Sequence, residues 1–85
     1  MKLYYRDGVA YKKVDRSQAR RLFLQGHKIF LMPSKISFDS AWIAPAEIDM
    51  ESELSLDGAV NAFNYYNCNS ETGCCAYYVE VKERF

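Results

Sequence analysis

The sequence predicts a small α+β domain in which a mainly antiparallel sheet packs against two helices. The 85-residue chain opens with a strong β-hairpin signal around Asp7-Gly8. Two segments with helical spacing of apolar residues, 15–26 and 55–68, are separated by strand-like segments. Because an opening hairpin breaks strict strand–helix alternation, we expect a mainly antiparallel sheet with two or three strands besides the hairpin. The length fits one compact domain over residues 1–85.

The hairpin is expected to turn at Asp7-Gly8, because glycine, and aspartate more readily than most residues, tolerates the positive φ of a type I′ turn. A two-residue loop places Tyr4 opposite Tyr11 and Tyr5 opposite Ala10. Alternation then predicts a core face made of Leu3, Tyr5, Ala10 and Val14. The outer face would carry Lys2, Tyr4, Arg6, Val9, Tyr11 and Lys13.

Residues 15–26 predict a capped amphipathic helix. Asp15 is placed to cap its N-terminus, with Gln18 at the capping-box position. Gly26 provides a left-handed C-cap. One face of this helix carries the apolar residues Ala19, Leu22 and Phe23. The outer face carries Arg16 and Arg20.

The remaining segments predict three more strands, a loop and the second helix. Residues 27–32 are expected to form a strand that is buried on both faces and stops at a proline. A short strand is expected over residues 41–44, "AWIA", before Pro45, and an acidic solvated loop after it. The helix over 55–68 would bury a face made of Leu56, Ala59, Val60, Phe63 and Tyr66. The last strand is expected over residues 74–82, after a polar turn.

All three cysteines lie between the second helix and the last strand. Cys74 and Cys75 are adjacent in the expected strand, so their side chains point to opposite faces and cannot serve one tetrahedral zinc. Buried cysteine behaves as a small hydrophobe, and we expect this role for Cys75 on the core side. The alternative is a redox pair between Cys68 and either of the other two. We expect no metal and no other cofactor.

The formal net charge is zero, but the charges are unevenly distributed, with Lys and Arg prevailing in residues 1–37 and Asp and Glu in residues 38–85. These charges either pair when the two halves fold together, or they present two faces of opposite sign that steer partners. Two candidate binding surfaces follow. The acidic one consists of Glu47, Asp49, Glu51, Glu53 and Asp57. The basic and aromatic one consists of Lys2, Tyr4, Arg6, Tyr11, Lys13, Arg16 and Arg20.

The two surfaces suit different partners. A row of carboxylates imitates a phosphate backbone and suits a protein that handles nucleic acid. Tyrosines surrounded by cations hold single-stranded nucleic acid by stacking and phosphate contacts. The same tyrosine pair could instead stabilise the sheet by itself or dock a protein, since Tyr and Arg are favoured interface residues. His27 has no second histidine and no nucleophile beside it, so we expect no catalytic group and no enzyme.

The stretches "NAFNYYNCNSETGCCAYYVEV" and "KLYYRDGVAYKKVDRSQARRLF" resemble a group of short, uncharacterised proteins of gut bacteria and of their phages and mobile elements. The resemblance covers most of the chain and is loosest over residues 35–58. It implies a mobile-element setting, in which small domains without catalytic motifs often inhibit host defence, as anti-CRISPR proteins do. The shared motifs carry no functional residues to this chain.

The sequence therefore predicts a non-enzymatic binding protein. The leading hypothesis is a phage-type inhibitor that engages a nucleic-acid-handling host defence protein, through the acidic stretch or the basic tyrosine face. The alternative is a small module that binds single-stranded nucleic acid through the hairpin. No apolar run approaches the roughly 20 residues that span a bilayer, and the polar start does not fit a signal peptide, so we expect a cytoplasmic protein with no membrane partner.

Overall fold

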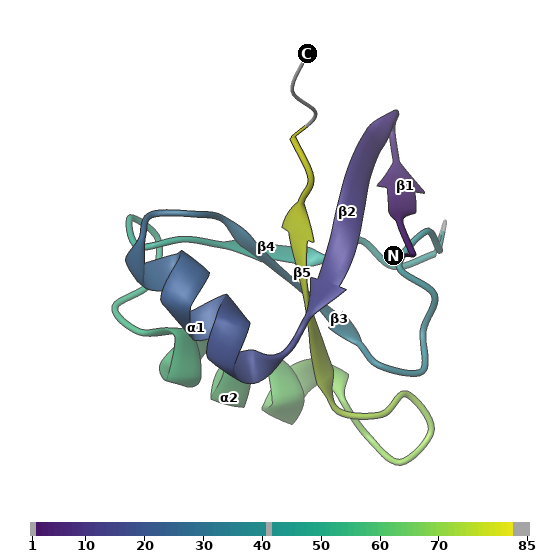
Figure 1. The fold of residues 1–85 in the computed structure, drawn as a ribbon. Coiled ribbons are helices and arrows are strands. Elements are labelled where there is room, and N and C mark those ends of the chain that lie inside the picture. The colour runs from purple at the N-terminus through teal and green to yellow at the C-terminus, as the bar shows by residue number, and fades with distance from the viewer. Residues whose placement is uncertain (1, 41, 83–85) are drawn as a thin grey trace.

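The computed structural model describes residues 2–40 and 42–82. Five strands form one antiparallel sheet in the order β1-β2-β5-β3-β4, and two helices pack on it (Figure 1). This arrangement confirms the α+β prediction. Neither helix that the structure describes is long and apolar enough to cross a membrane. The elements are β1 (Tyr4–Arg6), β2 (Val9–Val14), α1 (Arg16–Leu24), β3 (Ile29–Pro33), β4 (Ala46–Ile48), α2 (Leu56–Asn67) and β5 (Cys75–Glu80).

The N-terminal hairpin has the predicted register. Tyr4 pairs with Tyr11 and Tyr5 with Ala10. Asp7 and Gly8 both have positive φ, at 51° and 80°, as a type I′ turn requires. On the other side of β2 lies β5, the central strand of the sheet.

The predicted caps of the first helix are confirmed, and the second helix has an N-cap of the same kind. The Asp15 side chain accepts a hydrogen bond from the Gln18 backbone at the start of α1, and Gly26 follows that helix with a φ of 91°. At the start of α2, the Ser55 hydroxyl accepts one from the Gly58 backbone. Each contact satisfies one of the free N–H groups that a helix leaves at its N-terminus.

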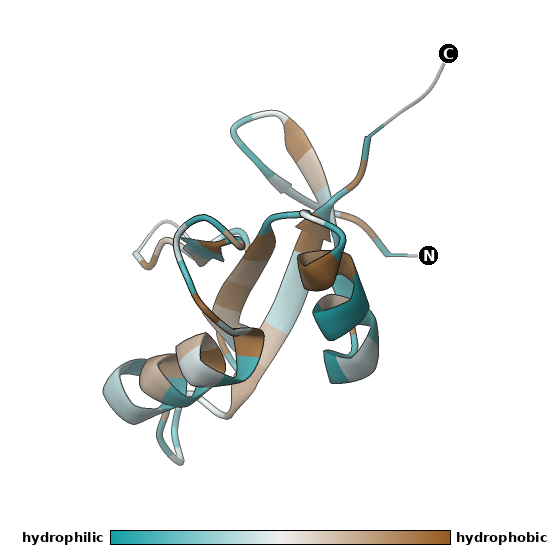
Figure 2. Ribbon diagram, turned by 90° about the vertical axis from the view of Figure 1, so that its left-hand side faces the viewer, coloured by the Kyte–Doolittle hydropathy of each residue, from teal (hydrophilic) through white to brown (hydrophobic). Residues whose placement is uncertain are grey.

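Both helices bury their apolar faces against the same face of the sheet. In Figure 2 the central strands are largely hydrophobic, whereas much of α1 is hydrophilic. Predicted alternation along β5 is also confirmed, with Cys75, Tyr77 and Val79 turned to the helices. The buried residues of this core are Val14, Ala19, Phe23, Ile29, Leu31, Ile48, Leu56, Ala59, Val60 and Val79.

The opposite face of the sheet is not open to solvent, because the loop after β3 covers it. Phe38 in this loop is fully buried and packs against Tyr78, with ring centroids 4.2 Å apart. Arg6 Nη1 donates hydrogen bonds to the carbonyl oxygens of Phe38 and Ser40, at 2.6 and 2.9 Å, and so fastens the loop to the hairpin. The sheet therefore has a second, smaller aromatic core.

The predicted division of the hairpin into two faces holds, but the loop covers the face that was expected to be the outer one. Tyr4 and Tyr11, expected on the outer face, are half-buried beneath Phe38. Tyr5, expected in the core, is 58% exposed. The core-face prediction was wrong for Tyr5, because the helices bury Val14 at the far end of β2 and leave the end of the hairpin open.

Two other expectations were wrong. The strand expected before Pro45 lies after it instead, because a proline lacks the N–H that a strand donates, whereas Ala46 and Ile48 can pair with β3. Residue 41 of that expected strand lies outside the described residues, and Trp42 is 93% exposed. Tyr66, expected on the buried face of α2, is 80% exposed, because it borders an open groove between α2 and β4.

Candidate functional site

The structure distributes the five acidic residues over three elements. Glu47 lies in β4, and its carboxylate forms an ion pair with Lys28 Nζ at 2.7 Å. Asp57 lies in the first turn of α2, and Asp49 begins the turn after β4. Only Glu51 and Glu53 are left exposed without an ion pair to any described residue.

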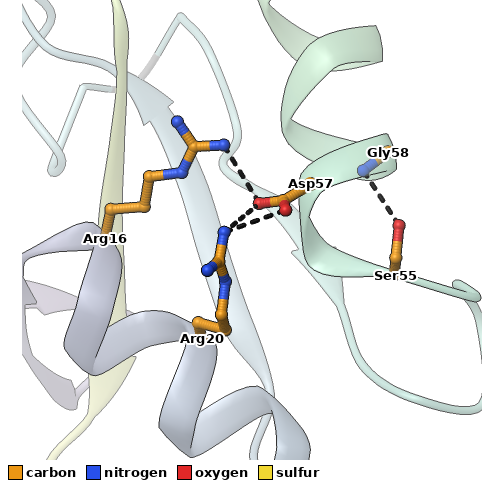
Figure 3. A network of polar contacts seen from close by, with 5 residues as sticks. All are labelled: Arg16, Arg20, Ser55, Asp57 and Gly58. Atoms are coloured by element: carbon orange, nitrogen blue, oxygen red, sulfur yellow. Dashed lines mark hydrogen bonds and ion pairs between the residues drawn. The ribbon is translucent and has the colours of Figure 1, made fainter.

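Asp57 joins the two helices. Its carboxylate accepts hydrogen bonds from Arg20 at 2.8 Å and from Arg16 at 3.0 Å, both from α1 (Figure 3). These bonds, first that of Arg20, hold the pKa of Asp57 below its ordinary value. Arg16 and Arg20 therefore lie at the helix junction and not beside the tyrosines of the hairpin. Every ion pair found among the described residues joins residues 1–37 to residues 38–85, so part of the charge asymmetry is neutralised internally.

Asp49 shapes the turn that carries the free carboxylates. Its side chain accepts hydrogen bonds from the backbone N–H groups of Ser52 at 2.9 Å and Glu51 at 3.0 Å. The Ser52 backbone contact is the main cause that lowers the pKa of Asp49. Asp49 is thus a structural residue that positions Glu51 and Glu53.

The hairpin residues of the basic surface do come together, but around Phe38. Tyr11 packs against Phe30 and Phe38 with ring centroids 5.0 and 4.8 Å apart. Tyr4 contacts Tyr78 edge-on, and Lys2 Nζ lies 5.0 Å from the centre of the Tyr4 ring. Burial raises the pKa of Tyr11.

The remaining cations of the hairpin have different surroundings. Arg6 is occupied by the loop carbonyls, whereas Lys13 is exposed. The basic surface therefore consists of packed rings with cations at its margin. Stacking of nucleic acid bases needs an open ring face, and the half-burial of Tyr4 and Tyr11 against Phe38 reduces the ring surface that is open.

The cysteines have the character of structural residues. All three are free thiols, and no group of described residues has the composition and proximity to hold a metal ion. Burial raises the pKa of Cys75 to about 12, and it also raises that of Cys68. Cys75 lies against the helix-side core, as predicted, and its backbone N–H donates to Asn64 Oδ1 at 3.0 Å.

A groove between α2 and the edge strand β4 is the feature that the sequence did not reveal. It encloses about 220 Å³. Strand β4 lines one side with Ala46 and Ile48, α2 lines the other with Ala62, Phe63 and Tyr66, and Glu53 lies beside them. One wall is therefore apolar and aromatic, and a free carboxylate borders it.

Two exposed tyrosines extend this groove over the surface of α2. Tyr65 and Tyr66 are 83% and 80% exposed, and their rings meet edge to face with centroids 4.9 Å apart. A signal for this pair was present in the sequence. Consecutive helical residues point about 100° apart, so two adjacent tyrosines cannot both face a core.

Comparisons with known proteins assign no function to these features. No protein family model, no curated protein and no solved structure matches the chain. The contacts and exposure of the described residues are therefore the basis for a functional proposal. We call the groove, with Glu51, Glu53, Tyr65 and Tyr66, the acidic–aromatic surface.

Proposed function

We propose that this chain is a non-enzymatic binding protein and that its acidic–aromatic surface docks on a basic surface of a partner protein. The observation that carries the proposal is that Glu53, whose charge is unpaired among the described residues, lines the same groove as the exposed Tyr66. Tyrosine contributes strongly to protein interfaces and packs well against arginine. Carboxylates at the margin steer a basic partner and select against acidic ones.

The partner class that we propose is a nucleic-acid-handling host defence protein. Such proteins hold phosphates with Lys and Arg, which carboxylates engage equally well. The resemblance to short proteins of gut bacteria and phages supports an inhibitory role of the anti-CRISPR kind. In this proposal Glu51 and Glu53 occupy positions that phosphates would take, and the tyrosines supply apolar contact.

Direct binding of single-stranded nucleic acid through the hairpin is the less favoured function. It requires open aromatic faces among cations. Tyr4 and Tyr11 instead pack against Phe38, and Arg6 is engaged by the loop carbonyls.

Capture of partners from bacterial lysate by the tagged chain, followed by mass spectrometry, tests the proposal. The test variant reverses two charges, Glu51→Lys with Glu53→Lys. The control reverses two exposed charges elsewhere, Glu71→Lys with Glu80→Lys, and so has the same net charge. We expect a captured protein that is lost with the first variant, retained with the second and released by added DNA or RNA.

Two results would contradict the proposal. One is a partner that both variants capture equally, because the surface would then lie elsewhere. The other is salt-dependent binding of labelled single-stranded DNA or RNA by the purified chain itself, which would favour the hairpin function.

A further inference from the structure

We infer that the groove receives an extended segment of the partner, which pairs with the open edge of β4 at Glu47 and turns one basic and one apolar side chain into the groove. The inference rests on the proposed function, because it requires a protein partner. It adds the conformation of the bound segment and the order of its side chains. Recognition of this kind combines backbone hydrogen bonds at a sheet edge with pockets for alternate side chains.

The register of β3 shows which backbone groups of β4 are open. Strand β4 is the last strand of the sheet. The N–H of Ser34 donates to the Cys74 carbonyl at 2.7 Å, so alternate residues of β3 turn their backbone groups to β5, and Ile29 and Leu31 turn theirs to β4. These two residues lie opposite Ile48 and Ala46, which leaves the N–H and C=O of Glu47 on the open edge.

Glu47 is the one residue of this edge with both its N–H and its C=O open among the described residues. Pro45, before β4, has no N–H to donate. After β4, the N–H of Asp49 donates to Ser52 Oγ at 3.1 Å, and its C=O accepts from the Glu53 N–H at 3.0 Å. A bound segment therefore exchanges one pair of backbone hydrogen bonds, and side chains in the groove must supply the remaining affinity.

Strand geometry places those side chains. The segment residue opposite Glu47 points to the same face as Glu47, so its two neighbours point to the helix side, as Ala46 and Ile48 do. The Glu53 N–H bonds to Asp49, which places Glu53 at the Ile48 end of the groove. A Lys or Arg beside Ile48 would meet this carboxylate.

The other end of the groove favours an apolar side chain. Asn64 in the second half of α2 accepts from the Cys75 N–H, and Cys75 pairs with Pro33 at the end of β3. The end of α2 therefore lies over the Ala46 end of β4, where Phe63 and Tyr66 line the groove. In an antiparallel segment the order of residues is basic, any residue, apolar.

The volume of the groove argues against a small molecule as its occupant, and the charge of Glu47 at the edge of β4 argues against a second copy of this chain. Its volume of about 220 Å³ falls below the range of roughly 300–1,000 Å³ of small-molecule sites, and it suits one or two side chains. A second copy of this chain, paired about β4, would place Glu47 opposite Glu47. Like charges directly opposite each other destabilise a strand pair, although the ion pair of each Glu47 with Lys28 reduces this repulsion.

Two variants on the same helix test the groove. Ala62 is exposed and lines the groove, so Ala62→Arg fills it with a cation and disturbs no buried residue. Asn61 is exposed and lies outside the groove lining, so Asn61→Arg is the matched control. The probes are acetylated and amidated threonine hexapeptides in which the third and fifth residues run through all twenty amino acids.

Binding is followed by the amide NMR signals of the labelled chain. We expect peptides with Lys or Arg third and Leu, Ile, Val, Met or Phe fifth to shift the signals of Glu47, Ala62 and Tyr66. Ala62→Arg should weaken this binding by about tenfold or more, the change that roughly 1.4 kcal/mol produces, and Asn61→Arg should leave it unchanged. N-methylation of the fourth residue, which faces Glu47, should weaken binding more than N-methylation of the third.

Three results would overturn the inference. They are a peptide set in which no member shifts these signals, equal losses in the two variants, and a concentration-dependent shift of Glu47 without peptide, which would mean self-association. The lysate capture separates this inference from the proposed function. A partner that is lost with the Glu51 and Glu53 reversals but retained by Ala62→Arg supports the acidic surface and excludes the bound segment.

Discussion

Phe38 is the fully buried side chain of the loop that closes the second face of the sheet. It lies in a loop, yet it is fully buried against Tyr4, Tyr11 and Tyr78. We expect Phe38→Ala to lower the free energy of unfolding by about 3–5 kcal/mol, because it leaves a cavity among three rings. Chemical denaturation measures the change. Trp42→Ala is the control and should change stability by less than about 0.5 kcal/mol, because Trp42 is 93% exposed.

Asp57 should make stability depend on pH in the acid range. Its pKa lies below the ordinary value of 3.8 because of Arg20 and Arg16, so the unfolded chain takes up a proton more readily than the folded one. The stabilisation is present above pH 3.8 and is lost as the pH falls through the lower pKa of the folded state. Asp57→Asn should reduce the fall in melting temperature in this range.

The control for this prediction is Glu71→Gln, which removes an exposed carboxylate that forms no ion pair with the described residues. Its melting curve should keep the acid dependence of the parent. Asp49, whose pKa is also lowered, titrates in the same range, so Asp57→Asn should remove only part of the effect. An unchanged acid dependence in Asp57→Asn would show that the arginine contacts do not persist in solution.

Residue roles were predictable from the sequence where local geometry decides them. The caps Asp15 and Ser55 and the turn at Asp7-Gly8 depend on neighbours within a few residues, and the sequence shows those neighbours. The burial of Phe38 depends on rings more than twenty residues away in both directions, so no local pattern in the sequence indicates it. Arg6 is likewise more than twenty residues along the sequence from the carbonyls that it binds.

At the scale of elements, the turn between α2 and β5 depends on Gly73. It has a φ of 85°, and a Cβ there would lie 2.2 Å from Ser34 Oγ and 3.2 Å from the Lys35 backbone nitrogen. Gly8 has a similar φ of 80° with open space around it. We expect Gly8→Ala to cost about 1–2 kcal/mol for the left-handed backbone alone.

Gly73→Ala should cost more than Gly8→Ala, because it adds the contact with the segment after β3. Thermal and chemical unfolding of the two variants side by side give the difference. Equal losses would mean that the turn shifts away from Ser34 without cost. The sequence predicted a polar turn before the last strand, but it could not show which segment lies beside this glycine.

The elements were predictable where periodicity or a turn signal marks them, as Asp7-Gly8 marks the three-residue strand β1. Both helices and the long strands carry enough periodicity to identify them, whereas β4 has three residues and carries almost none. Its position after Pro45 is decided by pairing with β3, which is a tertiary contact. The groove beside β4, which Tyr66 borders, therefore could not be predicted from the sequence.

At the scale of the whole molecule, the unevenly distributed charges divide into two groups. The first group forms ion pairs between the two halves of the chain, namely Asp57 with Arg16 and Arg20, and Glu47 with Lys28. The carboxylates of Glu51 and Glu53 stay outside these pairs. Folding thus reduces five candidate acids to two, of which Glu53 lines the groove.

This division predicts different binding kinetics for the two parts of the acidic–aromatic surface. Charges at a margin mainly change the association rate, whereas contacts inside a groove mainly change the dissociation rate. Reversing Glu51 and Glu53 to Lys should slow association with the captured partner and abolish its dependence on salt. The stability of the fold should change by less than about 0.5 kcal/mol, because both residues are exposed. Ala62→Arg should instead speed dissociation and keep the salt dependence.

Surface plasmon resonance over a range of salt concentrations measures both rates. The reversal of Glu71 and Glu80 is the control, because it changes the net charge of the molecule by the same amount at other places. If this control slows association as much as the test variant does, the partner responds to total charge and not to a localised surface. If both test variants act on dissociation alone, the carboxylates belong to the buried part of the interface, and steering by charge plays no role.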